Sequence, residues 1–179
     1  MAMRREVYIV GSGGQGVVLM GALLAEAYAL KNWNVVQTVV YDAAQRGGLA
    51  RAEVVMSDSE IYYPKVRKAD VIVAFAADAL PGARPKMDEH TVILADESLK
   101  DKNLEQYGTK LLFVPFERWA KEELHSSRVM NMVALGRVLK TLGDVSIDEV
   151  EQALKERFKG DLFKLNMAAV KIGLEASEF

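Results

Sequence analysis

Residues 7–31 read VYIVGSGGQGVVLMGALLAEAYALK, with a glycine-rich loop between two apolar runs. Residues 7–10 are β-branched and aromatic, which predicts a short strand, and residues 17–31 are rich in alanine and leucine, which predicts a helix. The loop between them, residues 11–16, satisfies the pattern G-x-G-x-x-G at the end of a strand and the start of a helix. A second apolar run follows over residues 35–41. Strand, glycine loop, helix and strand in this order predict a right-handed βαβ unit.

The rest of the chain continues the alternation of strands and helices. Residues 49–56 alternate loosely between apolar and polar side chains, residues 57–59 mark a turn, and residues 60–63 are expected to form a short partner strand that Pro64 ends. These two segments predict a β-hairpin. Ser146 followed by Glu149 is a capping box, which fixes the start of a helix. The other expected strands are 71–75, 91–95 and 110–114, and the other expected helices are 116–124, 127–142, 147–158 and 162–176. A helix broken by Pro81 and Pro85 is expected between strands 71–75 and 91–95.

The predicted architecture is α/β and Rossmann-like, with a mostly parallel sheet, a β-hairpin insertion after the second strand and a C-terminal helical segment. A chain of 179 residues, half of them hydrophobic and 27% charged, fits one packed domain over residues 1–179.

Composition excludes several classes of function. A net charge of −2 gives no basic surplus for binding nucleic acid. With no cysteine, the chain holds neither a disulfide nor a thiolate metal or iron–sulfur site, and it has no cysteine nucleophile. His90 and His125 lie far apart without acidic partners at metal-ligand spacing, so no metal site is predicted. No apolar stretch approaches the roughly 20 residues that cross a bilayer, so we expect no membrane association and a cytoplasmic location.

The glycine loop is the first candidate binding site. Gly11 is expected to take backbone angles closed to other residues, Gly13 to let an oxyanion approach the main chain, and Gly16 to let the helix pack close to the strand. Free amides and the positive end of the helix dipole then favour a phosphate. The alternative is a tight turn without a ligand. The candidate binding residues are Gly11, Ser12, Gly13, Gly14, Gln15 and Gly16.

A nicotinamide dinucleotide makes a further demand that the sequence does not meet. The carboxylate that binds its ribose usually lies about 20 residues after the loop, at the end of the second strand. Residues 36–38 are Val-Gln-Thr there, and Asp42 comes late. Binding of NAD is therefore disfavoured.

The second candidate segment is residues 41–48, YDAAQRGG, which follows the second strand and should lie at the same edge of the sheet as the glycine loop. Arg46 can pair with a phosphate or a carboxylate, and Gly47 and Gly48 let the backbone turn sharply beside it. A hairpin entrance with a solvated arginine explains the same pattern equally well.

Together, these segments resemble a known family. Residues 11–24 with their glycines, residues 41–58 with Arg-Gly-Gly, residues 61–66, residues 131–136 and residues 145–154 look like the gamma subunit of the 2-oxoacid:ferredoxin oxidoreductases, which are related to the indolepyruvate oxidoreductases. The resemblance covers nearly the whole chain.

The resemblance implies a multi-subunit enzyme that oxidatively decarboxylates a 2-oxoacid to an acyl-coenzyme A and reduces ferredoxin. It places thiamine diphosphate and the iron–sulfur clusters on partner alpha and beta subunits, with a ferredoxin-like delta subunit where present, and coenzyme A at or near this subunit. It makes the isolated chain inactive, with no catalytic residue of its own. The residues that match the family pattern at the coenzyme A or subunit surface are Gly11, Gly13, Gly14, Gly16, Arg46, Gly47 and Gly48.

Two alternatives share the glycine loop: a free-standing oxidoreductase that binds NAD(P), and a regulatory domain that senses a nucleotide or an acyl-coenzyme A. The aromatic run at Tyr62 and Tyr63 is a candidate subunit contact, since aromatic residues are enriched in interfaces.

Overall fold

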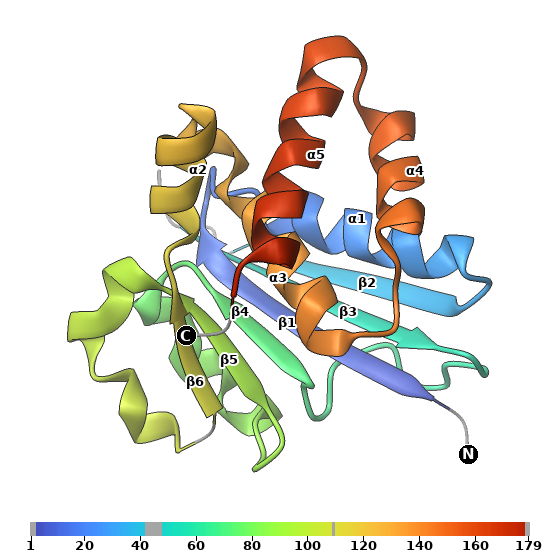
Figure 1. Ribbon diagram of the computed structural model, residues 1–179. Helices are drawn as coiled ribbons and strands as arrows, with labels where there is room; N and C mark the ends of the chain where they lie inside the picture. Colours follow the sequence, from blue (N-terminus) through green and yellow to red (C-terminus); the bar gives the residue numbers. More distant parts are fainter. Residues whose placement is uncertain (1–2, 42–47, 109, 178–179) are drawn as a thin grey trace.

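The computed structural model describes residues 3–41, 48–108 and 110–177. Its centre is a six-stranded sheet in the order β2-β3-β1-β4-β5-β6. The α-helices cover one face of this sheet, and shorter 3₁₀ helices and coil lie on the other (Figure 1). The strands are β1 (Arg4–Ser12), β2 (Asn34–Tyr41), β3 (Leu49–Ser57), β4 (Val71–Ala74), β5 (Val92–Asp96) and β6 (Lys110–Val114).

The helices follow the order that the sequence predicts. The α-helices are α1 (Val17–Leu30), α2 (Phe116–Leu124), α3 (Met130–Leu142), α4 (Ile147–Arg157) and α5 (Gly160–Glu175). The 3₁₀ helices are η1 (Ala77–Lys86), η2 (Glu97–Lys102), η3 (Leu104–Tyr107) and η4 (Ser127–Val129). The expected helix over 127–142 is divided between η4 and α3, and the expected broken helix is η1, which contains Pro81 and Pro85. The capping box at Ser146 and Glu149 is confirmed at the start of α4.

The sheet is mostly parallel, as predicted. β1, β4, β5 and β6 pair in parallel, whereas β3 pairs antiparallel with both β1 and β2. β2 therefore runs in the same direction as β1 but is separated from it by β3. The unit β1-α1-β2 is a crossover that leaves room for one antiparallel strand.

The prediction that residues 49–56 pair with residues 60–63 in a β-hairpin is wrong. Residues 60–63 are not a strand, and β3 pairs instead with β2 on one side and with β1 on the other, so the hairpin is β2-β3. Carboxylates hold the segment that follows residue 63: Glu53 Oε2 accepts the amide of Val66 at 2.8 Å, and Glu6 Oε2 accepts the amides of Arg67 and Lys68 at 2.5 and 2.9 Å. These amides bond to side chains and not to a neighbouring strand.

The two faces of the sheet carry separate cores. Val7 and Ile9 of β1 pack with the α-helices, and Tyr8 and Val10 pack with η1 on the other face. This alternation along one fully buried strand follows from the two-residue period of β-structure. No helix among the described residues is long and apolar enough to cross a membrane.

Candidate functional site at the glycine loop

The glycine loop connects the end of β1 to the start of α1 at the middle of the sheet. On one side of β1 the sheet continues with β3 and β2, and on the other side it continues with β4, β5 and β6. The loop contacts both sides, since Gln15 Nε2 donates to the carbonyl of Phe75, just after β4, at 3.4 Å. In open α/β sheets, ligands bind at this kind of switch point, at the carboxyl ends of the strands.

The conformation of the loop corrects two of the expected glycine roles. Gly11 lies within β1 and has no positive φ; it is needed because a Cβ there would come within 2.8 Å of Gln15 Oε1 and 2.9 Å of Val17 Cγ2. The left-handed positions are Gly14 and Gly16, at φ values of 91° and 73°. Gly16 makes room for Asn131 of α3, whose side chain a Cβ would overlap, and not for the strand.

Asn131 fixes the start of α1. Its Nδ2 donates to the carbonyl of Gly16 at 3.2 Å, and the residue is only 3% exposed. Gly16 is the N-cap of α1 and provides no side chain to bond the first turn. No role for Asn131 was predicted from the sequence, although Asn131 opens the segment 131–136 on which part of the family resemblance depends.

Several loop amides are already occupied. The amide of Ser12 donates to Gln15 Oε1 at 2.6 Å, that of Gly13 to the carbonyl of Gly48 at 2.9 Å, and that of Gln15 to the carbonyl of Ser12 at 3.2 Å. Within the described ranges, the amides of Gly14, Gly16 and Val17 have no protein acceptor. The set of donors left for an anion is smaller than the sequence predicts, and it lies at the start of α1.

The second candidate segment meets the first through Gly48. Its carbonyl accepts the amide of Gly13, and β3 begins at the next residue, opposite Ser12 of β1. The predicted meeting of the two segments at one edge of the sheet is confirmed at this residue. Arg46 and Gly47 lie outside the described residues.

A cavity of about 250 Å³ opens beside the loop. Arg128 is exposed and forms no ion pair within the part of the chain that the structure describes. Glu117 pairs with Lys121 at 2.8 Å, so part of its charge is compensated. The lining residues are Gly14, Gln15, Glu117, Ser127, Arg128 and Met130. A guanidinium facing the amino end of a helix suits one anionic group. More than 110 residues separate Gly14 from Arg128, and no sequence pattern joined them.

The groups whose pKa is raised by burial lie far from this loop. Burial raises the pKa of the Tyr28 phenol and of the Asp70 carboxyl. Both lie near the amino ends of β1 and β4, at the end of the sheet opposite the glycine loop. There the Tyr28 hydroxyl donates to Asp144, and Arg5 Nε donates to the same carboxylate at 2.6 Å. Asp144 precedes α4, so this cluster ties the helical layer to β1. It is structural in character and is distant from the switch point.

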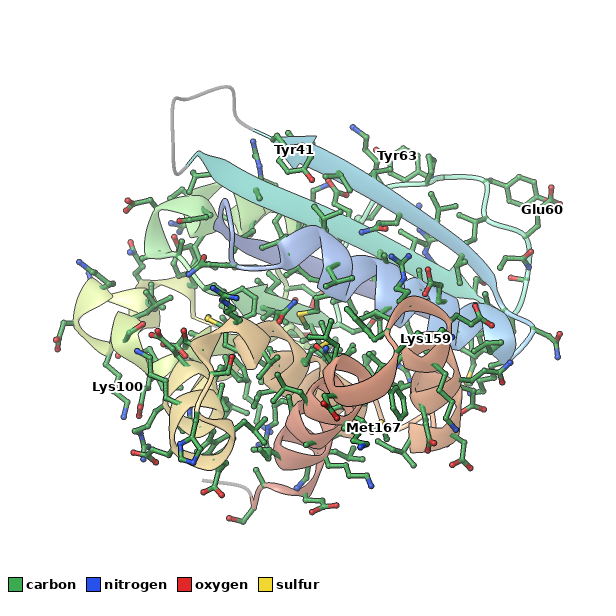
Figure 2. All side chains as sticks on the ribbon, turned by 90° about the horizontal axis from the view of Figure 1, so that it is seen from above. Tyr41, Glu60, Tyr63, Lys100, Lys159 and Met167 are labelled. Atoms are coloured by element: carbon green, nitrogen blue, oxygen red, sulfur yellow. The ribbon has the colours of Figure 1, made fainter. Side chains whose placement is uncertain are left out.

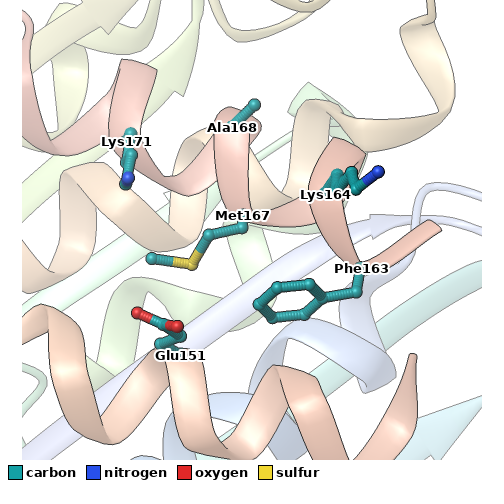
Figure 3. Close-up of a pocket in the computed structure, with 6 residues that line it drawn as sticks. All are labelled: Glu151, Phe163, Lys164, Met167, Ala168 and Lys171. Atoms are coloured by element: carbon teal, nitrogen blue, oxygen red, sulfur yellow. The ribbon is translucent and has the colours of Figure 1, made fainter. Parts of the chain in front are cut away.

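Two further observations concern other kinds of site. Among the described residues, no group of three or more His, Cys, Asp or Glu side chains is placed to hold a metal. A hollow of about 310 Å³ lies between α4 and α5, where Phe163 and Met167 face Glu151 (Figure 3). Glu151 pairs with Lys155 at 2.5 Å, and Lys164 and Lys171 also line this groove between the two helices.

The topology also bears on dinucleotide binding. In a dinucleotide-binding domain the ribose carboxylate follows a strand that lies next to the first one. Here the neighbour of β1 on that side is the antiparallel strand β3, and the end of β2 is one strand further away. This arrangement moves the expected ribose position away from the glycine loop.

Comparison with known proteins decides the family. A model of the family described as pyruvate ferredoxin/flavodoxin oxidoreductase matches residues 6–176. The chain belongs to this family. Within the pyruvate ferredoxin/flavodoxin oxidoreductase family, it is 34% identical to the 2-oxoglutarate synthase subunit KorC of Methanocaldococcus jannaschii, over 98% of this chain and 95% of that protein. It is 31% identical to the pyruvate/ketoisovalerate oxidoreductases common subunit gamma of Pyrococcus furiosus, over 97% of each chain.

Solved structures of the family share the fold. The keto/oxoacid ferredoxin oxidoreductase gamma subunit of Geobacter sulfurreducens matches with a TM-score of 0.83 and 28% identity, over 97% of this chain and 95% of that one. The predicted resemblance to gamma subunits of 2-oxoacid:ferredoxin oxidoreductases is confirmed, and the chain is a subunit of an enzyme of this kind. The alternatives of a free-standing NAD(P) oxidoreductase and of a sensing domain find no support.

Proposed function

We propose that this chain is the gamma subunit of a complex that converts 2-oxoglutarate and coenzyme A to an acyl-coenzyme A and carbon dioxide, with the two electrons passing to ferredoxin. The observation that supports this substrate is the sequence identity to relatives of which 89–97% of the length is matched. Four 2-oxoglutarate synthase subunits are 34–35% identical to this chain, whereas the gamma subunits shared by pyruvate and ketoisovalerate oxidoreductases are 30–31% identical.

The partners in this proposal are alpha and beta subunits that carry thiamine diphosphate and iron–sulfur clusters, with a ferredoxin-like delta subunit where present, in a cytoplasmic complex. The lack of cysteine supports this division of labour, because cysteine thiolates hold iron–sulfur clusters. Residues 1–179 act in it as one domain.

Coenzyme A is proposed to place one phosphate group at the glycine loop. The amides of Gly14, Gly16 and Val17 and the guanidinium of Arg128 supply the donors, at the positive end of α1. Arg46, Gly47 and Gly48 are proposed to complete this side of the site. The cavity of about 250 Å³ is smaller than the roughly 300 to 1,000 Å³ of sites that enclose whole ligands. The proposal therefore assigns the rest of coenzyme A to a partner subunit.

Kinetics of the purified complex test both parts. With wild-type chain, kcat/KM should be higher for 2-oxoglutarate than for pyruvate or 2-oxoisovalerate. Arg128→Ala should raise KM for coenzyme A about tenfold, the effect of losing one charge-assisted contact of about 1.4 kcal/mol, and should leave KM for 2-oxoglutarate unchanged.

Arg118→Ala is the matched control, because Arg118 is also an exposed arginine but pairs with Glu97 outside the lining of this cavity. An unchanged KM for coenzyme A in Arg128→Ala would contradict the proposed phosphate site at the glycine loop. A higher kcat/KM of the complex for pyruvate than for 2-oxoglutarate would contradict the proposed substrate, but the chain would still belong to the family.

A further inference from the structure

The two edges of the sheet differ in how they are protected. β6, at one edge, has five residues, begins with the exposed Lys110, and lies beside the ion pair of Arg118 and Glu97 at 2.6 Å. β2, at the other edge, has eight residues without charge or proline, NVVQTVVY. Charges, proline and short length are the means by which proteins keep an edge strand from pairing with another chain. β6 has such protection and β2 has none.

The unprotected edge is also apolar and open to solvent. Val40 is 42% exposed and Tyr41 is 66% exposed, and the remaining residues of β2 after Asn34 are only partly buried. Among the described residues, β3 is the only strand that pairs with β2. In the view from above, β2 forms the rim of the sheet, with Tyr41 near its end (Figure 2). No strand in the described ranges pairs with the outer row of backbone amides and carbonyls of β2.

A row of unpaired backbone groups on an exposed edge strand can template pairing with another extended strand. Because β2 is uncharged from Asn34 to Tyr41, pairing it with its own copy places no like charges opposite each other. We infer that this chain forms a two-fold homodimer in which the β2 strands of two copies pair antiparallel and join the two sheets into one.

Symmetry restricts the register of this pairing. Residues opposite each other in an antiparallel pair point to the same face, so a two-fold axis through the pair must place one residue opposite itself. With Thr38 on the axis, Val36 lies opposite Val40 of the second copy, and Val35 lies opposite Tyr41. Every exposed apolar residue of the strand then has an apolar partner. With Gln37 on the axis, Tyr41 would extend past Asn34, the first residue of the second strand.

The absence of native cysteine allows a direct test on the full chain. The wild-type protein should sediment at about twice its mass of 19.8 kDa. Thr38→Cys should form a disulfide-linked dimer under mild oxidation, because residues opposite each other lie about 4.5 to 5.5 Å apart. Val40→Cys, on the same edge, should not, because its own copy lies four residues along the strand from its partner Val36.

A charge on the edge provides a second, non-covalent test. Val40→Lys should weaken dimerisation at least tenfold and give the monomer mass. Leu162→Lys changes a leucine that is 60% exposed on α5 and should leave the dimer intact. Circular dichroism establishes that each variant is folded.

A wild-type chain that sediments as a monomer at tens of micromolar overturns the inference. So do disulfide-linked dimers that form as readily from Val40→Cys as from Thr38→Cys. If the complex with its partner subunits contains no Thr38→Cys disulfide, and Val40→Lys releases a partner subunit from it, the edge binds that subunit and not a second copy. These outcomes leave the proposed reaction untouched, because substrate preference and KM for coenzyme A are measured separately.

Discussion

The side chain of Asn131 donates to the carbonyl of Gly16 at 3.2 Å and fills the space that a Cβ at Gly16 would require. This contact connects α3 to the turn that starts α1, and it sets the position of the free amides at the glycine loop. The shape of the candidate site therefore depends on a residue 115 positions away from it.

The first prediction concerns this pair. Gly16→Ala should lower the free energy of unfolding by more than about 2 kcal/mol, because a left-handed φ costs alanine roughly 1 to 2 kcal/mol and its methyl group overlaps Asn131. Asn131→Ala should cost about 1 kcal/mol through the lost hydrogen bond. Urea unfolding of both single variants and of the double variant measures their coupling.

The overlap predicts that Gly16→Ala costs less in the Asn131→Ala background than in the wild type. Gly14→Ala is the control for the left-handed φ, because no atom lies within 4 Å of a Cβ there. Additive costs for the double variant would show that the two residues do not contact each other as described.

The second prediction concerns the crossing of α3 and α5. A Cβ at Gly136 would overlap the carbonyl of Val170 and approach the amide of Leu174 to 2.9 Å. Glycine to alanine inside a helix ordinarily gains about 1 kcal/mol. Here we expect the opposite sign, a loss of at least about 2 kcal/mol by urea unfolding, because backbone atoms cannot move aside as a flexible side chain can.

Gly143→Ala is the matched control, since Gly143 has a φ of 73° but open space around its Cβ position. Its cost should be about 1 kcal/mol and should come from the backbone angle alone. A stabilising Gly136→Ala would contradict the close helix crossing.

The third prediction concerns the capping box of α4. The hydrogen bond with Ser146 lowers the pKa of Glu149. A carboxylate whose pKa is lower in the folded state stabilises the fold above the unfolded-state pKa of about 4.3, and this contribution is lost as the pH falls through the folded-state pKa. Ser146→Ala should cost about 1 kcal/mol at pH 7 and distinctly less at pH 3.

Urea unfolding at the two pH values measures this difference. Ser126→Ala serves as the control, because Ser126 is the N-cap of η4 but its side chain makes no cap hydrogen bond. A cost of Ser146→Ala that is the same at pH 3 as at pH 7 would show that Glu149 does not take part in the cap as its carboxylate.

The fourth prediction concerns the segment after residue 63. The buried carboxylate of Glu6 accepts the amides of Arg67 and Lys68. Glu6→Ala leaves these amides without their acceptor and should favour local opening by about 1.4 kcal/mol, which corresponds to a tenfold faster tryptic cleavage after these residues. Glu151→Ala removes an exposed pair with Lys155 and should leave the cleavage rate unchanged. Equal rates in the two variants would place the anchor of this segment elsewhere.

Local sequence patterns predicted the strands and helices well, and the pairing of the strands poorly. Residues 60–63 carry the β-branched and aromatic side chains of a strand, yet Glu6 and Glu53 hold the chain that follows them through its amides. Those carboxylates lie on β1 and β3. Tertiary contacts, and not the local sequence, therefore decide that residues 60–63 do not pair as a strand. The insertion of β3 between β1 and β2 is likewise a choice among pairings that periodicity does not distinguish.

The candidate site was predicted in part, for a related physical reason. Gly14 and Gly16 follow from a strand-to-helix turn whose glycines are close in sequence, and the meeting with Gly48 follows from the rule that loops after parallel strands lie at one edge of the sheet. Arg128 of η4 and Asn131 of α3 reach the loop only because these two elements pack beside α1, and a single chain carries no pattern that marks such a contact. The occupied amides of Ser12 and Gly13 also depend on partners that local sequence does not specify.

This chain works as the gamma subunit of a 2-oxoacid:ferredoxin oxidoreductase. The most direct measurement is purification of the native complex through this chain, with the mass of every subunit and the rate of ferredoxin reduction by 2-oxoglutarate and coenzyme A. The account predicts larger subunits that contain thiamine diphosphate and iron–sulfur clusters, and activity that requires coenzyme A. A chain recovered without such partners, from an extract whose activity does not change when the chain is removed, would contradict it.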